Sequence, residues 1–320
     1  MPLTTMQVRT EVAPNGQYWP AARYSMGIPA ADVVRIWTTA QLQILEALRA
    51  AGVEAQVTKL HDDAAAKVHA VQQVMQQRPN LTVVSLDMYG GYGMPRPWGS
   101  VTLQVSRHYS PSGQYLGIGR RPGSPPLAKQ LKALKAAMGK NPLALYEDDI
   151  ATGGTLRECL ALLKQWGLDI AGIFVGFSPL DGDELEGIPL WTRQRIRPGE
   201  ETADMRDFFP ASNGGGLVIC NDHHVCEGTT AKPSQLWRAP YIGGPYGIDV
   251  SARASIPIDK VSKFSATAVE TSRWAYRELG MLRGTPIAVH EAPRHFQELA
   301  RIAGFRTDQP LAEFCRLLLQ

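Results

Sequence analysis

The stretch LALYEDDIATGGTLRECLALL, residues 143–163, decides the fold. Its apolar beginning predicts a short strand over 142–146, and the apolar spacing over 154–166 predicts an amphipathic helix that Gly167 ends. In a parallel α/β sheet, ligands bind beyond the carboxyl ends of the strands, where a new helix presents unpaired N–H groups with positive dipole character. The stretch therefore predicts a phosphate site at residues 151–155.

The residue types in this turn suit an anion. Gly153 and Gly154 let the backbone approach the ligand without a Cβ in the way, and Ala151 is also small. Thr152 and Thr155 add hydroxyl donors. The alternative is a plain strand–turn–helix connection in which Thr152 caps the helix. No Lys follows the glycines and no GxGxxG is present, which argues against a Walker loop and a dinucleotide fingerprint.

Two acids, Glu147 and Asp148, stand immediately before the turn. Their carboxylates would repel a phosphate unless something neutral or cationic lies between them. Ribose hydroxyls fit that gap, because ionised carboxylates accept hydrogen bonds from hydroxyl groups. The pattern therefore favours a sugar phosphate, with its phosphate in the turn and its hydroxyls on the two acids.

The segment EDDIATGGT, residues 147–155, resembles the ribose-5-phosphate motif of type I phosphoribosyltransferases. The resemblance places Glu147 and Asp148 on the motif's acidic pair and residues 151–155 on its phosphate turn. Asp149 departs from the pattern, because the family usually has an aliphatic residue there. Either the loop is more solvated in this chain, or Asp149 contacts a metal such as Mg²⁺ or the substrate.

The order of predicted elements agrees with this resemblance. Helices and strands alternate over residues 31–177, which is typical of a parallel sheet covered on both faces. The resemblance implies a type I phosphoribosyltransferase-like α/β core over 25–225, with a parallel sheet flanked by helices. We expect an irregular segment over 1–24 and a mainly helical addition over 226–320, near the substrate side. The clearest further elements are strands at 53–60, 81–88, 169–177 and 216–220, a hairpin of 101–107 with 115–119, and helices at 33–48, 127–138, 258–280, 292–303 and 310–319.

The resemblance also implies an activity. It is Mg²⁺-dependent transfer of phosphoribose from 5-phosphoribosyl 1-diphosphate (PRPP) to a nitrogen nucleophile, a nucleobase or related heterocycle, with release of pyrophosphate. The expected partners are PRPP and a small-molecule acceptor, and the family is often dimeric. Two alternatives stay open: a regulator that senses PRPP or nucleotides without chemistry, and a hydrolase or an enzyme that transfers ribose to a macromolecule.

Upstream, MYGGYG at residues 88–93 follows a predicted strand. It resembles the pyrophosphate loop of hypoxanthine-guanine phosphoribosyltransferases, which implies that Tyr89, Gly90 and Gly91 contact pyrophosphate. That family usually has Lys where this chain has Tyr89. A glycine turn with stacked tyrosines is the alternative.

The predicted hairpin over 106–121 resembles the flexible loop that closes over the substrate in the same family. Arg107 is the candidate catalytic residue here, and Arg120 and Arg121 are also basic groups able to reach pyrophosphate. An equally good interpretation is a solvated hairpin that displays its charges.

The segment over 239–253 is similar to the purine-contacting region of the hypoxanthine-guanine enzymes. The resemblance implies acceptor-binding roles for Tyr246, Asp249 and Arg253, although the spacing of the last two departs from the pattern. A Gly/Pro-rich loop with aromatic packing is the favoured alternative.

The segment CNDHHVCEG, residues 220–228, gathers Cys220, His223, His224 and Cys226. These ligand types suit zinc, but their spacing matches no known finger or ribbon. We therefore favour an ordinary loop or polar pocket residues over a zinc site, and we expect Cys220 to pack at the end of a strand.

Composition excludes several classes. No stretch reaches the roughly 18 apolar residues of a membrane span, and the opening residues lack the pattern of a secretory signal. The formal net charge of +3, from 33 basic and 30 acidic residues, does not indicate nucleic-acid binding. Four cysteines are too few for a disulfide scaffold and suit a reducing compartment. We expect a cytoplasmic enzyme of nucleotide metabolism.

Overall fold

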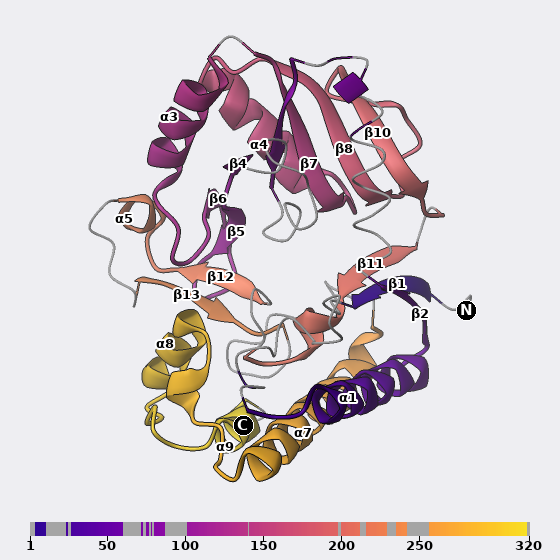
Figure 1. Ribbon diagram of the computed structural model, residues 1–320, viewed down its shortest axis with the longest axis vertical. Coiled ribbons are helices and arrows are strands. Elements are labelled where there is room, and N and C mark those ends of the chain that lie inside the picture. Colours follow the sequence, from indigo (N-terminus) through magenta and orange to yellow (C-terminus); the bar gives the residue numbers. More distant parts are fainter. Residues whose placement is uncertain are drawn as a thin grey trace.

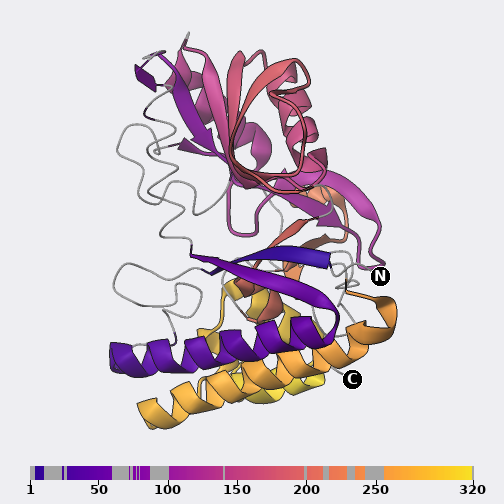
Figure 2. The same cartoon turned by 90° about the vertical axis from the view of Figure 1, so that its right-hand side faces the viewer.

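The computed structural model of the chain contains three sheets with helices around them (Figures 1 and 2). The structure describes residues 4–10, 24, 27–59, 72, 75–76, 78, 80–86, 101–139, 141–197, 200–211, 216–228, 235–241 and 256–318. Among these residues, no helix is both long and apolar enough to cross a bilayer.

The largest sheet has six strands and holds the predicted motif. Its spatial order is β4 (Val101–Thr102), β3 (Thr82–Ser85), β7 (Leu143–Asp149), β8 (Ile170–Ser178), β10 (Ile188–Arg195) and β9 (Glu184–Leu185). All neighbours pair in parallel except β9, which runs antiparallel to β10 at the edge. The predicted parallel arrangement is confirmed for β3, β7 and β8. Strand β10 was not predicted, because residues 181–215 carry Gly, Pro and charges without a sustained apolar period.

Side chains of β7 alternate between the two faces of this sheet, as the strand period requires. Leu143 and Leu145 pack with the helices α3 (Leu127–Met138) and α4 (Gly154–Gln165) in one hydrophobic cluster. Ala144 and Tyr146 pack on the other face with Phe174. Burial on both faces explains why this strand is a continuous apolar run up to its acidic end.

A second sheet of four strands carries the predicted hairpin. Its order is β13 (Leu236–Ala239), β12 (Leu217–Cys220), β5 (Val105–Tyr109) and β6 (Tyr115–Arg120). Strands β5 and β6 are antiparallel, which confirms the hairpin, and β12 confirms the strand predicted at 216–220. A five-residue helix, α5 (His223–Glu227), follows β12.

The third sheet corrects the expectation for the first 24 residues. Thr4–Thr10 forms strand β1, between β2 (Val53–Lys59) and β11 (Glu201–Asp204), with all three parallel. Met6 and Val8 are fully buried. A single seven-residue strand whose partners lie far along the chain gives only a weak local pattern, which is why the segment reads as irregular. Strand β2 also belongs here and not to the large sheet.

Helices from both ends of the chain pack together below the third sheet. Helix α1 (Ala30–Ala50) lies beside α7 (Ile258–Arg283), and α7 also contacts α9 (Leu311–Leu317) (Figure 2). With α8 (Arg294–Ile302), these elements confirm the C-terminal helices predicted from the sequence. One hydrophobic cluster joins Met6, residues of α1 and the C-terminal helices. The chain is therefore an α/β protein with mixed sheets flanked by helices.

Candidate functional site

The carboxyl end of β7 gathers three acids. Oxygen atoms of Glu147, Asp148 and Asp149 all lie within 4.8 Å of one another. Asp148 is buried, and its Oδ1 accepts a hydrogen bond of 2.8 Å from the backbone N–H of Asp149. The Thr202 hydroxyl donates to the Asp149 carboxylate from β11. Hydrogen bonds from the backbone of the six-stranded sheet and from Thr202 of the third sheet thus fix the positions of Asp148 and Asp149.

The turn after β7 leads directly into α4. Ile150 N–H donates to the carbonyl of Phe177 at 2.9 Å, which fixes the start of the turn on β8. Gly153 is the N-cap of α4 and has a φ of 77°, in the left-handed region. Because Gly153 has no side chain, the helix begins without a side-chain cap. The alternative in which Thr152 caps the helix is therefore wrong.

Two adjacent glycines provide a matched test of the turn. Gly153→Ala is expected to lower the free energy of unfolding by about 1–2 kcal/mol, because a Cβ at positive φ is strained. At Gly154 an added Cβ would find its nearest neighbour, Thr152 Oγ1, at 3.7 Å. Gly154→Ala is therefore expected to be neutral or slightly stabilising. Urea denaturation of both variants measures the difference, and equal losses would contradict the backbone argument.

A cleft of about 240 Å³ opens at the carboxyl ends of β3 and β7. It brings together most of the predicted site residues that the structure describes, namely Arg107, Glu147, Asp148, Asp149, Ala151, Thr152, Gly153, Gly154 and Thr155. Its location agrees with the rule that ligands of α/β sheets bind beyond the carboxyl ends of the strands. Other parts of the lining come from the second and third sheets.

The hairpin contributes two arginines to the cleft. Arg107 is exposed on β5 and lines the cleft. Arg121 follows β6 and is fixed by two backbone carbonyls, with Nε donating to Val105 at 2.8 Å and Nη2 to Leu86 at 2.7 Å. Arg120 does not line this cleft, and its Nη1 donates to the carbonyl of Ser124 at 3.2 Å. Of the three predicted cations, the structure thus brings Arg107 and Arg121 to the site.

Several lining residues were not predicted as site residues, and five of them carry charged or aromatic side chains near the ends of β11 and β13. They are Asp204, Arg206, Asp207, Arg238 and Tyr241, from β11, the 3₁₀ turn over Met205–Phe208, β13 and the residues after it. Arg206 Nη2 lies 2.5 Å from Asp204 Oδ2. The sequence does contain a signal for one of them, because Arg238 is a charged residue inside the apolar run LWRA at 236–239. Burying a charged side chain costs free energy, so its presence in a buried strand indicates a function.

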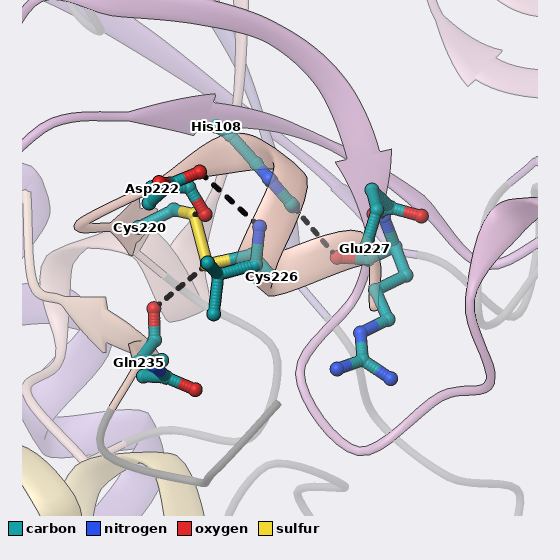
Figure 3. Close-up of a disulfide and its surroundings, with 8 residues drawn as sticks. His108, Cys220, Asp222, Cys226, Glu227 and Gln235 are labelled. Carbon is teal, nitrogen blue, oxygen red and sulfur yellow. Dashed lines mark hydrogen bonds between the residues drawn. A yellow bond between two sulfur atoms is a disulfide. The ribbon is translucent and has the colours of Figure 1, made fainter. Parts of the chain in front are cut away.

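The cysteine/histidine cluster is held by a disulfide (Figure 3). Cys220, at the end of β12, is bonded to Cys226 in α5, and both are fully buried. From the sequence we expected cysteines without disulfides, as is usual in a reducing compartment. For Cys220 and Cys226 this expectation is wrong. A zinc site at Cys220, His223, His224 and Cys226 is also excluded in this structure, because a disulfide offers no thiolate ligands. Among the described residues, the acids of β7 form the one group able to converge on a metal.

The disulfide closes a seven-residue loop and is expected to stabilise the fold. Replacing both Cys220 and Cys226 by Ala should lower the free energy of unfolding by about 2 kcal/mol, mainly by freeing the unfolded chain. Urea denaturation with and without a dithiol reductant tests this. The reductant should lower the stability of the wild type to that of the double variant and leave the variant unchanged. A wild type insensitive to complete reduction would contradict the prediction.

The other two cysteines, Cys159 and Cys315, are free and buried. Burial raises the pKa of both thiols well above its ordinary value, so neither is a reactive thiolate near neutral pH. Cys159 lies in α4 and its position contributes to the wall of the cleft. We assign it a packing role.

Two predicted groups lie outside the described residues. They are the pyrophosphate-loop candidates Tyr89, Gly90 and Gly91 and the acceptor-binding candidates Tyr246, Asp249 and Arg253. Their predicted roles remain predictions.

Comparisons with protein-family models, curated proteins and solved structures found no match to this chain. The residues of the cleft and the motif within it are therefore the guide to function.

Proposed function

We propose that this chain is a phosphoribosyltransferase that, with Mg²⁺, transfers the phosphoribosyl group of PRPP to a nitrogen atom of a small-molecule acceptor and releases pyrophosphate. One observation carries the proposal: the acidic end of β7, the glycine turn and two arginines of the hairpin line the same cleft. On this proposal the six-stranded sheet corresponds to the core of type I phosphoribosyltransferases, and the four-stranded sheet covers the substrate.

The 5′-phosphate of the donor would bind in the turn over 151–155. The first backbone N–H groups of α4 face outward from a helix with no side-chain cap, and the helix dipole favours an anion there. Gly153 adopts a backbone conformation that other residues rarely adopt, and it places no Cβ against the ligand. Thr152 and Thr155 also line the cleft and supply hydroxyl donors.

The acids of β7 would hold the ribose. Glu147 and Asp148 line the cleft immediately before the turn, where carboxylate oxygens accept hydrogen bonds from the ribose hydroxyls. Their negative charge also favours the positive charge that develops on the ribose ring as its bond to pyrophosphate breaks. Asp148 is buried, so its charge acts in a medium less polarisable than water.

The same acids fit a Mg²⁺ ion by chemistry and spacing. Magnesium prefers carboxylate and substrate oxygens, and the three acids place such oxygens within 4.8 Å of one another. Glu147 and Asp149 are the half-buried members and would hold the ion together with the substrate. A bound Mg²⁺ would neutralise negative charge on the pyrophosphate.

The hairpin arginines would bind the leaving pyrophosphate. Arg121 is held in place by two backbone carbonyls, so its guanidinium needs little reorganisation to accept an anion. Arg107 is an exposed side chain on β5 that lines the same cleft and can approach the same oxygens. Together they would stabilise negative charge as it leaves the ribose.

Calorimetric titration of the full chain with PRPP and Mg²⁺ tests the proposal. We expect saturable binding that needs the metal, followed by pyrophosphate release once a suitable nitrogen heterocycle is added. Lack of PRPP binding by folded protein would contradict the donor assignment. Binding with no pyrophosphate release across a broad panel of acceptors would contradict the transfer step.

A further inference from the structure

We propose that Arg157 is a positioning residue for the phosphate turn, whose backbone it fixes through the carbonyl oxygen of Thr152, and that Glu186 holds Arg157 in place. This inference rests on the proposed function, because it concerns the turn over 151–155 that is assigned there to the 5′-phosphate. Neither residue was predicted to belong to the site. Arg157 stands two positions after the motif, and Glu186 follows it by 29 residues.

Arg157 binds two consecutive carbonyl groups at the start of α4. Its backbone N–H donates to the carbonyl of Gly153 at 2.9 Å, which begins the hydrogen-bonding pattern of the helix. Its side chain extends back along the chain, and Nη1 donates to the carbonyl of Thr152 at 2.8 Å. One residue therefore connects the glycine turn to the first turn of the helix.

The carbonyl of Thr152 belongs to the peptide group that decides the shape of the turn. Gly153 has φ 77° and ψ 4°, as the third residue of a type II turn has, whereas in a type I turn this residue has a φ of about −90°. The two types differ mainly in the direction of the preceding peptide group, which here joins Thr152 to Gly153. Because a trans peptide is planar, fixing its carbonyl oxygen also fixes the N–H of Gly153 on the opposite side. A reversed peptide group would exchange this donor for an oxygen atom, which repels phosphate.

Arg157 acts from outside the cleft. The described lining includes Thr152 and Gly153 but not Arg157, whose side chain is 45% exposed. It therefore orients the backbone that faces the ligand and does not itself contact the phosphate. An ion pair as exposed as that of Arg157 with Glu186 contributes little to the stability of the fold. Effects on binding and on stability can thus be separated.

Glu186 lies in a turn that suits a different residue type. With Gly187 it forms the two-residue connection between β9 and β10, and the flanking residues Leu185 and Ile188 pair directly. The φ values of 54° at Glu186 and 72° at Gly187 are those of a type I′ turn, which favours Asn, Asp or Gly at its first position. The carboxylate of Glu186 contacts Arg157, whose Nε donates to Oε1 at 3.0 Å. The unfavourable residue of this turn is thus the one that orients Arg157.

Calorimetric titration of the full chain with two probes tests the inference. Ribose 5-phosphate reports on the turn, and pyrophosphate with Mg²⁺ reports on the remainder of the cleft. Arg157→Gln should weaken ribose 5-phosphate binding by about fivefold or more, because the hydrogen bond from a charged donor is lost. Its affinity for pyrophosphate should stay within about twofold of the wild type. Arg157→Lys keeps a cationic donor and should bind ribose 5-phosphate within about threefold of the wild type.

Glu186→Gly separates positioning from stability. Glycine suits a positive φ, so urea denaturation should give a midpoint equal to or above that of the wild type. Arg157 loses its partner, so ribose 5-phosphate binding should weaken by about threefold. The matched control is Arg195→Gln, which removes an arginine of similar exposure that donates to two backbone carbonyls and pairs with Asp183, outside the cleft. It should bind both probes as the wild type does.

Three results would overturn the inference while the wild type still binds PRPP and the proposed function stands. They are unchanged ribose 5-phosphate affinity in folded Arg157→Gln, an equal loss of pyrophosphate affinity in the same variant, and full ribose 5-phosphate affinity in Glu186→Gly. Failure of the proposed function looks different. In that case the wild type itself binds neither PRPP nor ribose 5-phosphate, and both proposals are wrong.

Discussion

Asp148→Asn is expected to weaken PRPP binding tenfold or more, a loss of about 1.4 kcal/mol. The side chain lies at the end of β7, is 7% exposed and lines the cleft. Asparagine keeps the shape and retains an oxygen for the Asp149 N–H, which lies 2.8 Å from Asp148 Oδ1. What it removes is the negative charge beside the proposed ribose site. Calorimetric titration with PRPP and Mg²⁺ measures the loss.

The matched control is Glu184→Gln, which removes an exposed carboxylate from β9 at the edge of the same sheet, outside the cleft. It should bind PRPP as the wild type does. Thermal unfolding establishes that both variants are folded. A folded Asp148→Asn protein with unchanged affinity would show that the ribose does not contact this carboxylate.

Glu227→Ala is expected to lower the free energy of unfolding by about 3 kcal/mol. Glu227 follows the disulfide-bonded Cys226 (Figure 3). Its two carboxylate oxygens accept hydrogen bonds from different segments. Oε1 accepts from the backbone N–H of Arg120 at 2.5 Å, and Oε2 from that of Leu127 at 2.9 Å. Leu127 is the first residue of α3, where a negative charge is favoured by the helix dipole. Removing the carboxylate leaves two backbone donors without their partner.

Urea denaturation measures the effect. Glu227→Gln should lose less, because its amide keeps one oxygen acceptor. Asp183→Ala serves as control, since its exposed ion pair with Arg195 on β10 should contribute less than about 1 kcal/mol. Equal losses for Glu227→Ala and Asp183→Ala would contradict a bridging role for Glu227.

The sequence predicted those parts of the fold that are local. Helix α3 has the bounds expected from its apolar spacing, and the unit of β7, turn and α4 was recognised because strand, acids, glycines and helix are contiguous. Strands β1 and β10 were missed. Each pairs with strands whose positions are fixed by tertiary contacts, and neither has a strong pattern of its own.

Only the part of the candidate site formed by the end of β7, the turn and the start of α4 was predicted from the sequence. Glu147 to Thr155 are contiguous in sequence, and the structure brings them to the cleft as expected. Arg206 and Arg238 were missed because a single charged residue, even inside an apolar run such as LWRA at 236–239, does not show in the sequence which cavity it lines. The Cys220–Cys226 bond was also missed, since a spacing of six residues suits a loop, a metal site or a disulfide equally.

The parallel pairing of β1 with β11 has a consequence for biosynthesis. Met6 is made well before its partner Glu201, which follows it by nearly two hundred residues. The cleft is completed later still, by Arg238 and Tyr241. Contacts between such distant positions must overcome a large loop-closure entropy and form slowly. During synthesis β1 can pair with β2, but its other edge stays open until β11 has been made, and the cleft is incomplete for longer still, which exposes the nascent chain to aggregation in this period.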